Sequence, residues 1–200
     1  YMSKALSTFS RHLGSITEGI TEDYIVDPMA QNGEILTELG DFGYLRLVGC
    51  ETAPHNKYLQ QNLKEQFGIA QVASDVHFQV IQASIDSPSS MLSQLKTVSF
   101  TPIDCLDGHE HTMDKERLSS ENTRLILVAP ETRVRINKIF VRKIEILMES
   151  FPKLLVISNY TNLETLLTIN NHNFETQKTI GQWIVLFNHP EYDEGPCAWY

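Results

Sequence analysis

The sequence has no apolar run that approaches the roughly 18 residues of a membrane-spanning helix, so we expect no transmembrane segment. Positive charge is also scarce, because 16 Lys and Arg stand against 25 Asp and Glu among 200 residues, giving a net charge of −9. Proteins that clamp nucleic-acid backbones need clustered Lys and Arg. The composition therefore predicts no nucleic-acid partner.

Cysteine is rare, and Cys50, Cys105 and Cys197 form no Cys-x-x-Cys pair. An odd count without a disulfide framework indicates free thiols in a reducing compartment. The first residues lack the basic and then apolar pattern of a secretory signal. These features predict a cytoplasmic protein.

Several catalytic signatures are missing as well. The chain contains no Gly-x-Ser-x-Gly elbow, no phosphate-binding Gly-x-x-x-x-Gly-Lys-Ser/Thr loop and no Gly-x-Gly-x-x-Gly turn. We therefore expect no bound cofactor, with zinc as the alternative discussed below.

From residue 44 onward, short apolar runs alternate with segments of helical periodicity. Strands are predicted over residues 44–50, 76–85, 125–128, 154–157 and 183–187, and helices over residues 56–67, 87–95, 134–150 and 162–169. Such alternation is typical of an α/β fold with a doubly wound, mainly parallel sheet, here five-stranded, and flanking helices. Ligands of such sheets bind at the carboxyl ends of the strands.

The first 43 residues are predicted to form a helical leader and a connector, and residues 44–200 an α/β domain with an inserted loop at 99–122. The leader has an apolar seam that either packs on its own domain or joins two copies in a homodimer. The seam consists of Leu6, Phe9, Leu13, Ile16 and Ile20. Residues 21–43 are acidic and contain glycines, and we expect one short strand at 35–39. Whether the chain is a complete protein or an excised domain stays open.

Three segments resemble receiver domains of response regulators. Residues 44–68 are similar to the first strand and helix of that family, and residues 151–166 to its fourth strand and following helix. Phe187-Asn188-His189-Pro190 falls where the family has a fifth strand that ends on Lys-Pro. The resemblance implies a receiver-like fold over roughly residues 44–190.

The phosphorylation chemistry of that family is largely absent. Glu51 supplies one carboxylate of the expected acidic pair, and Ala129-Pro130-Glu131 follows the third predicted strand without an acceptor Asp. Asp86 would be the acceptor only if residues 76–85 formed the third strand. Ser158 and His189 would replace the Thr/Ser and Lys of the family. The resemblance therefore implies a pseudo-receiver, a non-catalytic regulatory domain that acts through protein partners.

An acidic stretch in the inserted loop is a candidate metal site. Cys105, His109 and His111 are residue types that bind zinc, and His-x-His places both imidazoles on one side of an extended segment. The neighbouring acids are Asp104, Asp107, Glu110, Asp114 and Glu116. The alternative is a solvated acidic loop.

A second cluster follows the last predicted strand, where His189 and Glu191 are candidates for general acid–base catalysis together with Glu51 or His55. Either cluster would make the chain a metal-dependent hydrolase, the first alternative function. A structural subunit of a larger assembly is the second alternative.

Positive charge gathers in one place, around the helix at 134–150. Its basic residues are Arg133, Arg135, Lys138, Arg142 and Lys143. They indicate either a surface for an acidic partner or a solvated helix face.

Overall fold

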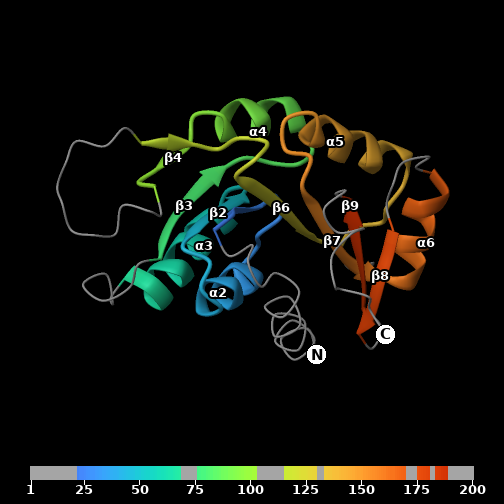
Figure 1. Cartoon of the computed structure of the whole chain (residues 1–200), viewed down its shortest axis with the longest axis horizontal. Coiled ribbons are helices and arrows are strands. Elements are labelled where there is room, and N and C mark those ends of the chain that lie inside the picture. The colour runs from blue at the N-terminus through green and yellow to red at the C-terminus, as the bar shows by residue number, and fades with distance from the viewer. Residues whose placement is uncertain are drawn as a thin grey trace.

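The computed structural model describes residues 22–68, 76–102, 115–129, 133–169, 175–180 and 183–188. In this part of the chain, a seven-stranded sheet of order β3-β2-β1-β6-β7-β9-β8 is covered by helices on both faces (Figure 1). Its strands are β1 (Tyr24–Asp27), β2 (Arg46–Glu51), β3 (His77–Gln82), β6 (Thr123–Val128), β7 (Leu154–Asn159), β8 (Glu175–Ile180) and β9 (Trp183–Asn188). The helices are α2 (Glu34–Asp41), α3 (His55–Leu63), α4 (Pro88–Leu95), α5 (Lys138–Met148) and α6 (Tyr160–Ile169), and a π-helical turn at Lys64–Gly68 extends α3.

Five strands, β3, β2, β1, β6 and β7, are paired in parallel. This confirms the predicted α/β class with a mainly parallel, doubly wound sheet. The two remaining strands form a hairpin in which β9 runs antiparallel to β7 and β8 antiparallel to β9. Counted in chain order, the parallel strands have the order 3-2-1-4-5 of dinucleotide-binding sheets. The receiver-like order would be 2-1-3-4-5.

The expectation of a connector over residues 21–43 is wrong, because β1 and α2 lie there. Strand β1 occupies the middle of the sheet between β2 and β6, with Ile25 and Val26 completely buried. The strand expected at residues 35–39 is a helix, α2, which buries Ile35, Leu36 and Leu39. These three side chains follow the i, i+1, i+4 spacing of one helix face, and that spacing outweighs their content of aliphatic residues.

Alternating side chains of the central strands build two cores, one on each face of the sheet. Ile25 points into the core that α2 and α3 cover, together with Leu36 and Leu59. Val26 points into the core beneath α4 and α5, where Phe140 is packed. Because both faces of β1 and β6 are covered, these strands are apolar along nearly their whole length.

The inserted segment at 99–122 contains a two-stranded antiparallel ribbon of β4 (Ser99–Phe100) and β5 (Glu116–Arg117). The five residues of the leader seam, Leu6 to Ile20, lie outside the described residues, so the dimer prediction stays a prediction. Within the described ranges, no helix combines the length and the apolar character needed to cross a membrane.

We predict that Gly40→Ala destabilises the protein. A Cβ at Gly40 would lie 2.4 Å from Cζ of Phe67, whose ring is buried against α2. Overpacking of this kind costs about 1–3 kcal/mol of unfolding free energy, which exceeds the helix preference of alanine. Urea denaturation of the wild type, Gly40→Ala and the double variant Gly40→Ala/Phe67→Leu measures the effect. Gly40→Ala should cost less unfolding free energy when it is added to Phe67→Leu than when it is added to the wild type, because leucine leaves more room for the new Cβ. An unchanged urea midpoint for Gly40→Ala alone would contradict the packing described.

Candidate ligand site at the carboxyl ends of the central strands

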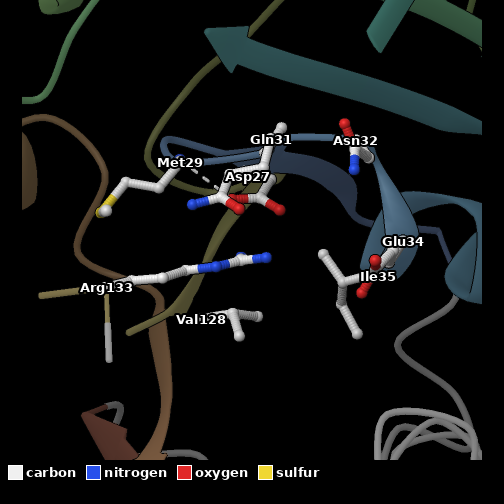
Figure 2. A pocket seen from close by; sticks show the side chains of 9 residues that line it. Asp27, Met29, Gln31, Asn32, Glu34, Ile35, Val128 and Arg133 are labelled. Carbon is white, nitrogen blue, oxygen red and sulfur yellow. Dashed lines mark hydrogen bonds between the residues drawn. The ribbon is translucent and has the colours of Figure 1, made fainter. Parts of the chain in front are cut away.

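A crevice lies where the chain leaves β1 and β6 in opposite directions. Helix α2, which follows β1, packs on one face of the sheet, and α5, which follows β6, packs on the other. Such a topological switch point is where open α/β sheets bind ligands. A cavity of about 10 Å³ lies there, with room for about one water molecule. Asp27, Gln31, Val128 and Arg133 are among the residues that line it (Figure 2).

The loop between β1 and α2 has an unusual backbone. Gln31 has φ of 49° and Gly33 has φ of 79°, so both lie in the left-handed region, which is uncommon for a residue with a side chain. The loop is tied to the neighbouring strand by a hydrogen bond from the Ala30 N–H to the Cys50 carbonyl (3.2 Å). Gly33 allows close packing, because a Cβ there would lie 2.7 Å from Cδ1 of Leu59.

Glu51, at the end of β2, holds this loop in place. Its Oε2 accepts a hydrogen bond from the Gln31 N–H (2.8 Å), and its Oε1 accepts one from the Thr52 N–H (3.0 Å). An ionised carboxylate offers about four acceptor positions. Oε1 also accepts a hydrogen bond from the Thr52 hydroxyl (3.4 Å). Glu51 is half-buried, so it retains the capacity to bind one further donor.

Asp27, at the end of β1, is almost completely buried and accepts a hydrogen bond from the Met29 N–H (3.0 Å). Burial raises the pKa of this carboxyl to about 7, a change that the nearby Glu51 carboxylate reinforces and that the Met29 N–H and the Arg133 charge oppose. In Figure 2, Asp27 and Arg133 point into the same space, Asp27 from β1 and Arg133 from the segment after β6. The site therefore combines a carboxyl that titrates near neutral pH with a guanidinium group.

Cys50, the residue before Glu51, is a free and buried thiol. Burial, with the carboxylates of Asp27 and Glu51 close by, holds the pKa of Cys50 far above its usual range. The thiolate is the reactive form of cysteine. Cys50 is therefore a packing residue and not a nucleophile.

The segment after β6 is fixed to α6 by one buried amide. Asn162 donates to the carbonyl oxygens of Ala129 (3.0 Å) and Val134 (2.8 Å), and its Oδ1 accepts from the Ile136 N–H (3.1 Å). Ser158, which the receiver resemblance would place next to a phosphoryl group, instead donates its hydroxyl proton to the same Ala129 carbonyl. These bonds fix the chain on both sides of Arg133.

Of the catalytic candidates predicted from the sequence, Glu51 lies beside this crevice and is bonded to Gln31, which lines it, while His55 is exposed at the start of α3. His189 and Glu191 lie outside the described residues. The predicted grouping of His189 with Glu51 requires that β9 runs parallel to β2 and ends at the same edge of the sheet. It was wrong, because Asn188 at the end of β9 pairs with Leu154 at the start of β7.

The predicted zinc ligands Cys105, His109 and His111 also lie outside the described residues, so the zinc alternative stays a prediction. Among the residues that are described, no group of three or more His, Cys, Asp or Glu side chains is arranged to hold a metal ion.

Sequence reasoning missed Asp27, Gln31 and Arg133. One signal was present in the run Tyr24-Ile25-Val26-Asp27, four residues that end on an acid and precede a loop closed by Gly33. Four residues are too few to establish a strand by periodicity, and the crevice becomes visible only when β1 is placed beside β6.

No protein-family model and no curated protein sequence matches the chain. Solved structures do resemble it. The rRNA methyltransferase aviRa from Streptomyces viridochromogenes is 10% identical over 84% of this chain and 77% of its own, with a TM-score of 0.56. A candidate methylase from Haemophilus influenzae is 14% identical over 92% of this chain and 98% of its own, with a TM-score of 0.53. A mutant of MtNAS in complex with S-adenosylmethionine is 11% identical over 95% of this chain and 64% of its own, with a TM-score of 0.55.

At these identities the likeness shows the fold, and it corrects two hypotheses drawn from the sequence. The resemblance to receiver domains is wrong, because the chain is similar in fold to these solved methyltransferase structures, and its own parallel strands have the order 3-2-1-4-5 instead of 2-1-3-4-5. The hypothesis of a non-catalytic signalling domain depended on that resemblance and is overturned with it.

We predict that Asp27 makes stability fall as pH rises. The pKa of Asp27 is raised from 3.8 to about 7 in the folded state, so the folded protein binds more protons than the unfolded chain between these values, and its stability decreases as that proton is lost. Relative to the wild type, Asp27→Asn should gain about 2–3 kcal/mol of unfolding free energy between pH 5 and pH 8. Urea denaturation at both pH values measures this gain. Asp41→Asn, which neutralises an exposed carboxylate, is the control, and an equal change in both variants would refute the prediction.

Proposed function

We propose that this chain is a methyltransferase that binds S-adenosylmethionine in the crevice at the ends of β1 and β2. The observation that carries the proposal is the link between Glu51 and Gln31, which joins the end of β2 to the β1–α2 loop at the topological switch point. In sheets of this order, an acidic residue about 20 positions after the first loop binds the ribose of a nucleotide cofactor. Glu51 lies 24 residues after Asp27 in the sequence and occupies that place.

The donor set of the crevice fits this cofactor. S-adenosylmethionine has a ribose diol, a positively charged sulfonium, and an ammonium and a carboxylate group on its methionine part, so that its net charge is positive. Glu51 retains acceptor capacity for the diol, and Asp27 supplies a second carboxyl that faces the cavity. Carboxylates stabilise nearby cations, so the acidic character of the crevice matches the charge of the cofactor.

The same residues disfavour a dinucleotide. A pyrophosphate needs several glycines in the first loop so that the backbone can approach it closely. Here the loop contains a single glycine, Gly33, which packs against Leu59. Two carboxylates beside the loop would also repel phosphate groups. A cofactor without phosphates is therefore the better match for this loop.

When bound, S-adenosylmethionine supplies an electrophilic methyl group, which an acceptor's lone pair takes while the carbon–sulfur bond breaks and leaves S-adenosylhomocysteine. Glu51 would hold the ribose and keep the loop in its left-handed turn through Gln31. Asp27 would face the cationic end, and Arg133 would border the acceptor's side of the crevice. Asn162 would keep that border in position through its bonds to Val134 and Ile136.

The predictions on location and partners are kept as proposals. We propose a cytoplasmic, reducing environment, supported by the free thiol of Cys50. Protein partners and a homodimer through the leader are proposals that the described residues do not address.

We predict that S-adenosylhomocysteine binds the wild type and that Glu51→Ala weakens this binding at least about tenfold. Hydrogen bonds to a charged group contribute about 1.5–3 kcal/mol, and 1.4 kcal/mol corresponds to a tenfold change in Kd. Isothermal titration calorimetry measures both constants. Glu51→Gln keeps an oxygen for the Gln31 N–H and should lose less affinity than Glu51→Ala.

Glu65→Ala is the matched control, because Glu65 is an exposed carboxylate in the turn after α3. Its affinity should equal that of the wild type. Absence of any binding to the wild type would refute the proposed function, and NADH titrated in parallel would show whether the crevice accepts a dinucleotide instead.

A further inference from the structure

A second, larger cavity lies between the start of α5 and the outer side of α6, on the segment that leaves β6. Its volume is about 470 Å³, within the range of small-molecule sites. Helices α5 and α6 contact each other, and Figure 1 shows them side by side at one end of the sheet. We name this cavity the α5–α6 groove; its lining residues are Arg135, Ile136, Asn137, Lys138, Thr161, Asn162 and Thr165.

Hydrogen bonds of two asparagine side chains, Asn162 and Asn137, hold the walls of the α5–α6 groove in place. The Asn162 amide uses both its nitrogen and its oxygen on the backbone of the segment that leads into α5. Asn137 caps α5 by accepting a hydrogen bond from the Phe140 N–H (2.9 Å). The groove is therefore held in shape before any ligand arrives, which lowers the entropic cost of binding.

The charge of the groove contrasts with that of the whole chain. Arg135 and Lys138 are exposed on its rim, and no carboxylate is found among the described residues that line it, although the chain carries a net charge of −9. The crevice cavity near β1, by comparison, is lined by Asp27 and Glu34. Such a local concentration of positive charge favours an anion.

Arg135, which precedes α5, and Lys138, its first residue, are available to bind an anion, unlike the two basic residues further along α5. Arg142 is paired with Glu145 (3.2 Å), and Lys143 is paired with Asp86 (2.8 Å). Within the described part of the chain, neither Arg135 nor Lys138 forms an ion pair with a carboxylate. The five basic residues noted in the sequence thus divide into three sets: two are paired with carboxylates, two line the groove, and Arg133 lines the crevice near Asp27.

Two further features add to the attraction for an anion. The first turn of α5 contains no acidic residue, so the positive end of the helix dipole is not neutralised within its own helix. Thr161 of α6 also lines the groove and carries a hydroxyl group. Thr165, one turn further along α6, donates its hydroxyl proton to the Thr161 carbonyl (2.9 Å) and lies on the same helix face.

We propose that the α5–α6 groove binds the anionic group, a carboxylate or a phosphate, of a small molecule that accepts the methyl group. This rests on the proposed function, because the groove adjoins the crevice through one segment: Arg133 lines the cavity near Asp27, and Arg135, two residues on, lines the groove. A polyanion such as RNA is a poorer match, since a chain with a net charge of −9 repels an extended phosphate backbone. A single anionic group needs only the two cations of the groove.

The test is a titration of the full chain with inorganic phosphate and, separately, with acetate, at constant ionic strength. Chemical shifts of backbone amides in a ¹H–¹⁵N correlation spectrum report binding. We expect saturable shifts at residues 135–138 and 161–165 with at least one anion. In the double variant Arg135→Gln/Lys138→Gln, the affinity should fall at least about tenfold, as expected when charge-assisted bonds are lost. Shifts with phosphate alone would indicate a phosphorylated acceptor, and shifts with acetate a carboxylic acid.

Arg142→Gln is the matched control, because it removes the same charge from the same helix outside the groove, and it should bind like the wild type. The proposal is overturned if neither anion gives saturable shifts, or if the double variant binds as tightly as Arg142→Gln. Titration of S-adenosylhomocysteine separates the two levels. If that ligand binds while the anions do not, the groove assignment fails and the proposed function stands. If the anions bind and S-adenosylhomocysteine does not, the assignment to a methyl acceptor is overturned together with the proposed function.

Discussion

The burial of β1 between β2 and β6 is the constraint on which the rest of the structure depends. Its backbone hydrogen bonds join the two halves of the sheet, and its side chains contribute to both cores. Because the chain leaves β1 toward one face and β6 toward the other, the ends of these strands border the crevice that Asp27 and Arg133 line. The same placement buries Asp27 at the mouth of that crevice and sets its pKa near neutrality.

Much of the sheet could be predicted from the sequence, because covered strands such as β6 and β7 each contain four consecutive apolar residues. The sequence does not predict β1, because four residues carry no clear period. It favours a strand where α2 lies, because the aliphatic side chains there are close together. The direction of β9 could not be inferred either. A six-residue apolar strand looks the same in both directions, and its antiparallel pairing with β7 is decided by tertiary contacts. Without β1 in the middle of the sheet and with β9 assumed to be parallel, the sequence favours the receiver-like strand order.

The candidate site was predictable only in part. Glu51 could be proposed because an acid follows a clear apolar strand, and such an acid points to the ligand edge of a sheet. The sequence shows Arg135 and Lys138 as basic residues, but not how they differ from Lys143, because that residue is paired with Asp86 from a distant segment of the chain. The role of Asp27 can be recognised only in the folded structure, because its raised pKa comes from burial by segments that are distant in sequence.

In the proposed function, the single carboxylate of Glu51 would both hold the loop and bind a ribose, and this would couple the two tasks. The oxygen that accepts the Gln31 N–H also belongs to the group that would hold a ribose, so the shape of the loop and the occupancy of the crevice form one equilibrium. A ligand that draws Glu51 toward the crevice alters the turn at Gln31, and a change that relaxes the turn alters affinity by the same factor. The exchange rate of the Gln31 amide hydrogen with solvent would then differ between the empty and the filled crevice, even though this N–H need not contact the ligand.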